Sequence, residues 1–98
     1  MNKLGINLWN WVQGLGPDCL GLPRKAAGLG FTAVELPMTT ALVDPKLAAE
    51  VRESGLEVSL CASLGAGRDL SSFDEGPRAA ALDYLTACLE SGRVLGAS

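Results

Sequence analysis

The sequence predicts an α/β fold with parallel strands, in which three strands and three helices alternate in the order β-α-β-α-β-α. Three short apolar stretches, each bounded by glycine or proline, begin about 27 residues apart, the length of a compact strand–helix unit. Segments with apolar residues at helical spacing separate them. Strands joined by crossover helices run in parallel within one sheet. The 98 residues are therefore expected to form part of a single domain, residues 1–98.

Glycine, proline and aspartate mark the ends of the first two expected helices. The first covers Leu20–Leu29, with Pro23 near its start and Gly30 just after its end. The second begins at Asp44-Pro45, an aspartate that can cap the helix followed by a proline suited to its first turn. Gly55 is expected to end it.

The third helix is expected to begin between Ser72 and Pro77. Ser72 and Glu75 have the spacing of a capping box, whereas Pro77 favours a later start. Gly96 marks its end, and Gly92 is expected to weaken its last turn. Its apolar stripe consists of Leu82, Leu85 and Leu89.

Each expected strand has one aliphatic face and one face of small or polar residues. The strands cover Lys3–Trp9, Phe31–Leu36 and Leu56–Ser63. Their aliphatic faces carry Leu4, Ile6, Leu8, Val34, Leu36, Val58 and Leu60. Their opposite faces carry Gly5, Asn7, Trp9, Ala33, Glu35, Ser59, Cys61 and Ser63. Helices on one side and a shared interior on the other fit a barrel better than a sheet covered on both faces.

The pattern therefore predicts the N-terminal three β/α units of a (β/α)8 TIM barrel, an incomplete barrel. Such a barrel needs about 250 residues, and a fourth strand is expected to start near Gly96. The polar residues Asn7, Glu35 and Cys61 are expected toward the C-terminal ends of the strands, where barrels of this kind place their active sites. A small open α/β domain is the alternative, with two unpaired sheet edges.

Composition excludes several classes of function. The net charge is −3 and the eight basic residues are scattered, so we expect no nucleic-acid partner. No apolar run approaches the roughly 20 residues that span a bilayer, and no secretory signal is evident, so we expect no membrane partner. The absence of histidine removes Ser/His/Asp and Cys/His nucleophile systems. Three widely spaced cysteines without a CxxC pair indicate a reducing, cytoplasmic location.

An ordered set of motifs resembles the sugar phosphate isomerase/epimerase family, which has the xylose-isomerase-like TIM barrel, and most of all its D-tagatose and D-psicose (D-allulose) 3-epimerases. The resemblance runs from end to end of the chain. Its motifs are Leu4-Gly5-Ile6-Asn7-Leu8-Trp9-Asn10-Trp11, the segment from Gly28 to Pro37, Gly55-Leu56-Glu57-Val58 with Cys61, Arg68-Asp69-Leu70-Ser71-Ser72, the segment from Arg78 to Tyr84, and Leu95-Gly96-Ala97.

The resemblance implies a metal-dependent ketose 3-epimerase that exchanges the C3 proton through an enediolate. In this family two glutamates, an aspartate and a histidine on later strands hold Mn²⁺, Mg²⁺ or Co²⁺. None of these ligands has a counterpart here, so we expect this chain alone to be inactive, to hold no metal and to contain no catalytic residue. It would supply one wall of the sugar pocket, and the full-length protein is expected to be a homo-oligomer.

Four residues are expected to contact the sugar: Asn7, Trp9, Glu35 and Cys61. Cys61 matches a pocket position where a member of the family also has cysteine, whereas Asn7 stands where the best-known 3-epimerases have an aromatic residue. Three of the four also have a simpler interpretation. Trp9 could be loop packing, Glu35 a hydrogen-bond partner that fixes the pocket floor, and Cys61 a small buried filler.

Two other functions remain open at this point. The chain could be a non-catalytic α/β binding or interaction module that assembles with another chain to cover its sheet edges. A flavodoxin-like regulator is a weaker fit, because its phospho-acceptor site needs clustered acidic residues at strand ends and Glu35 stands alone there.

Overall fold

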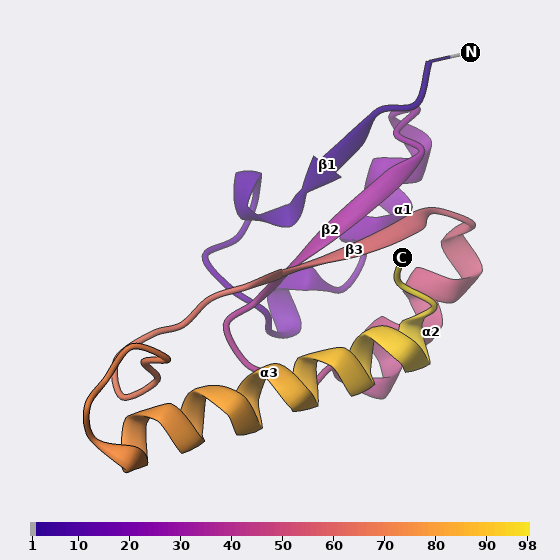
Figure 1. The fold of residues 1–98 in the computed structure, drawn as a ribbon. Helices are drawn as coiled ribbons and strands as arrows, with labels where there is room; N and C mark the ends of the chain where they lie inside the picture. The colour runs from indigo at the N-terminus through magenta and orange to yellow at the C-terminus, as the bar shows by residue number, and fades with distance from the viewer. Residues whose placement is uncertain (1) are drawn as a thin grey trace.

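The protein is an α/β domain built on a three-stranded parallel sheet, as the sequence predicts. The computed structural model describes residues 2–98. The strands are β1 (Gly5–Asn7), β2 (Ala33–Met38) and β3 (Glu57–Ala62), hydrogen-bonded in the order β1-β2-β3. Helices α1 (Leu22–Gly28) and α2 (Pro45–Ser54) connect them, and α3 (Glu75–Leu95) follows β3 (Figure 1). Five of these six elements fall within the segments expected from the sequence, and β2 extends two residues beyond the expected end at Leu36.

The first strand is shorter than expected and ends before Trp9. The chain turns after Asn7 into a short 3-10 helix, η1 (Leu8–Asn10). The side-chain oxygen of Asn7 accepts a hydrogen bond from the backbone N of Trp9 at 2.9 Å, which caps this turn. A strand reaching to Trp9 was therefore a wrong prediction, because a local side-chain bond replaces the sheet hydrogen bond. A second 3-10 helix, η2 (Pro17–Cys19), precedes α1.

The predicted helix cap is present at the start of α2 and absent at the start of α3. The Asp44 carboxylate accepts a hydrogen bond from the backbone N of Lys46 at 2.7 Å, so this cap is confirmed. At α3 the capping-box prediction is wrong. The Ser72 hydroxyl oxygen accepts from the backbone N of Asp74 at 3.1 Å, a local turn, and Asp74 takes the capping position without a side-chain bond to the helix.

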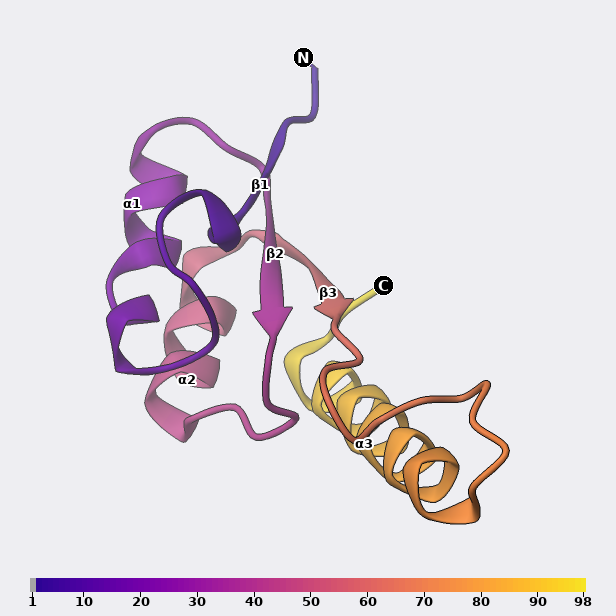
Figure 2. The ribbon, with the colours of Figure 1, turned by 90° about the vertical axis from the view of Figure 1, so that its left-hand side faces the viewer.

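A carboxylate on α2 caps the start of α1. The N-terminus of α1 has no capping bond from its own N-cap residue, Gly21. Instead, Glu50, which is buried, accepts hydrogen bonds from the backbone N of Gly21 at 2.9 Å and of Arg24 at 3.5 Å. A negative charge at a helix N-terminus is favourable, and the bond fixes α1 against α2 on one side of the sheet (Figure 2).

The helices cover one face of the sheet, and the aliphatic side chains point toward them. In β2, Val34, Leu36 and Met38 are fully buried in the core. Glu35, Ser59 and Cys61, of opposite parity, are half-buried. The alternation predicted for β2 and β3 is therefore present. In the first segment it fails at Leu4, which lies before β1 and is 61% exposed.

Tyr84 connects α3 to the ends of two strands. Its hydroxyl donates to the backbone oxygen of Met38 and accepts from the backbone N of Ser63 at 2.9 Å. The guanidinium of Arg68 lies 3.9 Å from the centre of its ring. Burial raises the pKa of Tyr84 above its ordinary value of 10.0. One buried hydroxyl thus holds β2, β3 and α3 together.

Removing this hydroxyl should destabilise the domain. Tyr84→Phe leaves the Ser63 amide and the Met38 carbonyl without their partner, which costs about 1–3 kcal/mol of unfolding free energy. Because the pKa is higher in the folded chain, stability is fully present below pH 10 and falls as the pH rises through the folded pKa. Urea unfolding at neutral pH measures the first effect. Absorbance titration of Tyr84, the single tyrosine, measures the second, and a midpoint at or below 10.0 would contradict the burial argument.

Candidate functional site: a polar row on the open face of the sheet

The face of the sheet opposite the helices carries a shallow hollow of about 210 Å³. Its floor crosses all three strands, because the register aligns Asn7 with Glu35 and Glu35 with Ser59. Strand neighbours in register lie side by side about 4.8 Å apart. The lining residues are Gly5, Ile6, Asn7, Ala33, Val34, Glu35 and Ser59.

The carboxylate of Glu35 receives one hydrogen bond from each neighbouring strand. The side-chain nitrogen of Asn7 donates to Oε1 at 2.7 Å, and the Ser59 hydroxyl donates to Oε2 at 2.7 Å. The remaining oxygen of the Asn7 side chain accepts from the backbone N of Trp9. A half-buried carboxylate is thereby satisfied by neutral donors, and its position is fixed from both sides.

The upstream end of the hollow is kept open by small residues. A Cβ atom on Gly5 would lie 3.2 Å from the Cβ of Ala33, so a larger residue in β1 would crowd the floor. The Glu35 carboxylate therefore lies beside two positions with little or no side chain. Acceptor oxygens of Glu35 and the hydroxyl of Ser59 are the groups that this hollow offers to a ligand.

The structure brings together two of the four sequence-predicted site residues. Asn7 and Glu35 are directly bonded. Trp9 has left the strand, is 40% exposed and touches this row through its backbone. Cys61 lies two residues beyond Ser59 on β3, opposite Pro37, half-buried and outside the lining of the hollow. The alternation of side chains along a strand therefore does not predict the position of Trp9, because β1 ends at Asn7.

Glu35 lies in the middle of its strand, which corrects the expectation that it stands near the C-terminal end. β2 continues for three residues to Met38, because Leu36 and Met38 are buried against the helices and extend the ladder with β3. Asn7, in contrast, is the last residue of β1. The row thus lies at the C-terminal end of β1 but three residues before the ends of β2 and β3.

Ser59 is the member of the row that the sequence reasoning missed as a site residue. The signal was present, since Ser59 has the same parity as Cys61 and lies on the polar face of its strand. What the sequence lacked was the register, which pairs Ser59 with Glu35 and Cys61 with Pro37. A one-residue change of register would have separated the serine from the carboxylate.

Residues 2–98 contain no group of three or more His, Cys, Asp or Glu side chains that could hold a metal ion. None of the helices described in this range combines the length and apolar character that crossing a membrane requires.

A scan against protein-family models and a search of curated proteins each returned no match to this chain.

The role of Glu35 as an acceptor can be tested by substitution. Glu35→Ala leaves the donors of Asn7 and Ser59 without their partner, and the expected loss of unfolding free energy is about 1–3 kcal/mol. Glu35→Gln keeps one oxygen acceptor and should lose less. The matched control is Glu53→Ala, an exposed glutamate on α2, expected to change stability by less than about 0.5 kcal/mol. Equal losses in Glu35→Ala and Glu53→Ala would contradict this role.

Proposed function

We propose that the chain is the N-terminal portion of a sugar isomerase or epimerase with a TIM-barrel fold, and that its open polar face is one wall of the sugar pocket. The hydrogen-bonded row of Asn7, Glu35 and Ser59 carries this proposal. A barrel needs helices on one face and a shared interior on the other. The distribution of aliphatic and polar residues across β2 and β3 is consistent with that requirement.

The proposed reaction is that of a metal-dependent ketose 3-epimerase, by resemblance to that family. It would exchange the proton at C3 of a ketose through an enediolate. Residues 2–98 do not fit the divalent ion, Mn²⁺, Mg²⁺ or Co²⁺, that such an enzyme uses. The ion and the glutamates that move the proton would lie outside these residues. The full-length protein is proposed to be a cytoplasmic homo-oligomer.

This chain would bind and orient the sugar. Glu35 keeps acceptor capacity beyond the bonds from Asn7 and Ser59, since each carboxylate oxygen has two acceptor sites. A sugar hydroxyl donating to Glu35 would be placed at a fixed point, because both neighbouring strands hold the carboxylate. Trp9 follows Asn7 just after the end of β1, and Cys61 lies two residues further along β3 than Ser59. These two would contact the parts of the sugar that extend past the hollow.

Replacing Cys61 by a bulky residue should weaken sugar binding without unfolding the protein. Cys61 is half-buried on the open face, away from the buried core. In the full-length protein with Mn²⁺, Cys61→Phe should raise KM for a ketohexose by about tenfold and leave kcat within a few-fold, since it obstructs binding and not proton transfer. The assay is deuterium incorporation at C3 in D₂O. Cys61→Ser is the control of similar size. Absence of C3 exchange in the unsubstituted protein would overturn the proposal.

The isolated chain should show no tight site for a divalent ion. Hard cations need several converging oxygen ligands, and the described carboxylates do not converge. Calorimetric titration of residues 1–98 with Mn²⁺ or Co²⁺ should reveal nothing tighter than micromolar. A stoichiometric site of higher affinity would mean that the chain carries metal ligands of its own.

A further inference from the structure

The side-chain amide of Asn7 has a hydrogen-bond partner at each of its two ends. Its nitrogen donates to Oε1 of Glu35 on the neighbouring strand at 2.7 Å, and its oxygen accepts from the backbone N of Trp9 at 2.9 Å. A carboxylate only accepts and a backbone N–H only donates, so a single orientation of the amide satisfies both partners. Asn7 therefore joins the carboxylate of the polar row to the turn that carries Trp9.

The turn after β1 is held at several points of its backbone. Leu8 is fully buried, and its carbonyl accepts from the backbone N of Trp11 at 2.9 Å. The Asn10 side chain donates to the backbone carbonyl of Asn7, also at 2.9 Å. Trp9 is 40% exposed, so the backbone of this turn places its ring more than packing does. A shift of the Asn7 side chain would therefore pass directly to the backbone at Trp9.

The bond to Glu35 requires an amide at position 7, whereas the cap alone does not. Aspartate caps such a turn about as well as asparagine does. Its second oxygen, however, would face Oε1 of Glu35, where Asn7 now donates. Two negative charges at that distance repel each other. None of the described residues that line the hollow is basic, so no neighbouring charge there offsets the repulsion.

We propose that Asn7 is a positioning residue that fixes Trp9 relative to the Glu35 carboxylate. Its effect on sugar binding rests on the proposed function, in which Glu35 and Trp9 both contact the sugar. The link itself is a property of these three side chains and backbone groups. Asn7 thus acts through its two neighbours and not through a sugar contact of its own, which is a different role from the one its strand position predicted.

Hydrogen exchange of the isotope-labelled chain, residues 1–98, tests the link. Asn7→Asp should speed exchange of the Trp9 amide by about tenfold or more, because repulsion from Glu35 moves the capping oxygen away. The Trp11 amide belongs to the same turn but is bonded to the carbonyl of Leu8. Its exchange should change by less than about threefold.

Tyr84→Phe is the control for a loss of overall stability. It removes a buried hydroxyl that bonds the backbone of Met38 and Ser63, outside the polar row. Exchange that follows unfolding of the whole domain would rise for both tryptophan amides alike. The ratio of the Trp9 rate to the Trp11 rate should therefore stay unchanged in this variant.

The double variant Asn7→Asp, Glu35→Gln restores the link with its direction reversed. The amide then stands on β2 and donates to the carboxylate on β1, whose other oxygen still caps the turn. The amide oxygen accepts from the Ser59 hydroxyl, as the carboxylate did. Exchange of the Trp9 amide should return to within about threefold of the unsubstituted chain. Glu35→Gln alone should also preserve it, because an amide oxygen still accepts from Asn7.

The same variants in the full-length protein with Mn²⁺ test the consequence for the sugar. Asn7→Asp should raise KM for a ketohexose by about tenfold and leave kcat within a few-fold, measured as deuterium incorporation at C3. In the Glu35→Gln background, the same change at Asn7 should alter KM by less than about threefold. Such non-additivity is expected of two residues that act through one contact.

Equal exchange of the Trp9 amide in Asn7→Asp and in the unsubstituted chain would overturn the link and leave Asn7 a simple cap. Faster exchange that the double variant does not reverse would overturn it as well, since the effect would then not pass through Glu35. An intact link without the change in KM would overturn the role in sugar binding. Absence of C3 exchange in the unsubstituted protein would instead remove the proposed function, and the Trp9 exchange rates would still decide the link.

Discussion

The alternation of side chains in β2 and β3, in a fixed parallel register, is the constraint on which the rest of the structure depends. It sends Val34, Leu36 and Met38 into the helix-covered core and leaves Glu35 on the other face. The same register aligns Glu35 with Asn7 on one side and Ser59 on the other. A shift of a single residue would bury the carboxylate and expose the core. Burial of the aliphatic face thus fixes the position of the polar row.

Two buried polar groups outside that row hold the helices in place. Glu50 accepts from the first turn of α1, and Tyr84 connects α3 to the ends of β2 and β3. Both act between elements that are far apart in sequence, and both satisfy backbone groups that helix and strand ends leave unpaired. Together they hold the helices on the side of the sheet opposite Glu35, so that the polar row remains accessible.

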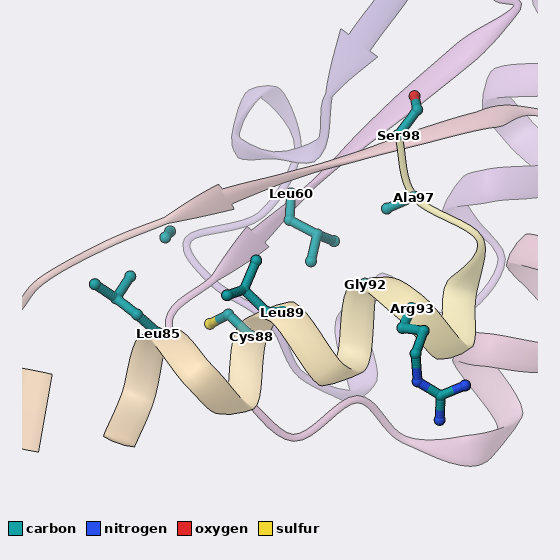
Figure 3. A pocket seen from close by; sticks show the side chains of 9 residues that line it. Leu60, Leu85, Cys88, Leu89, Gly92, Arg93, Ala97 and Ser98 are labelled. Atoms are coloured by element: carbon teal, nitrogen blue, oxygen red, sulfur yellow. The ribbon is translucent and has the colours of Figure 1, made fainter. Parts of the chain in front are cut away.

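Adjacent residues of β3 belong to surfaces of opposite character. Ser59 donates to the carboxylate of the polar row, while Leu60 lines an apolar concavity beside α3 (Figure 3). The first surface offers hydrogen-bond acceptors and suits a hydroxylated ligand. The second has aliphatic walls from Leu60 of β3 and from Leu85 and Leu89 of α3. One strand therefore contributes to a proposed sugar-binding wall on one face and to an apolar concavity on the other, without sharing lining residues between them.

The order of the elements could be predicted from the sequence, because it depends on local signals. Glycine, proline and aspartate mark the ends of α2, and period-two alternation marks β2 and β3. The end of β1 and the start of α3 were harder to predict, because short polar side chains there can form more than one local hydrogen bond. The Asn7 side chain ends β1 early by bonding the Trp9 amide, and Ser72 forms a turn in place of a capping box. In both cases a short polar side chain accepts a hydrogen bond from the backbone N–H two residues ahead, and this local bond replaces the predicted strand or capping box.

By itself, then, the sequence determined the α/β order, the parallel strands and the polar parity of Asn7, Glu35 and Cys61. The tertiary structure decided which of these meet. Register paired Glu35 with Ser59 and set Cys61 opposite Pro37, and no local pattern contains that information. The apolar concavity between β3 and α3 was equally inaccessible to sequence reasoning. At its margin Gly92 lies against Leu60 and Ser98 returns to Val58, contacts between residues more than thirty positions apart that form only when the helix packs on the sheet.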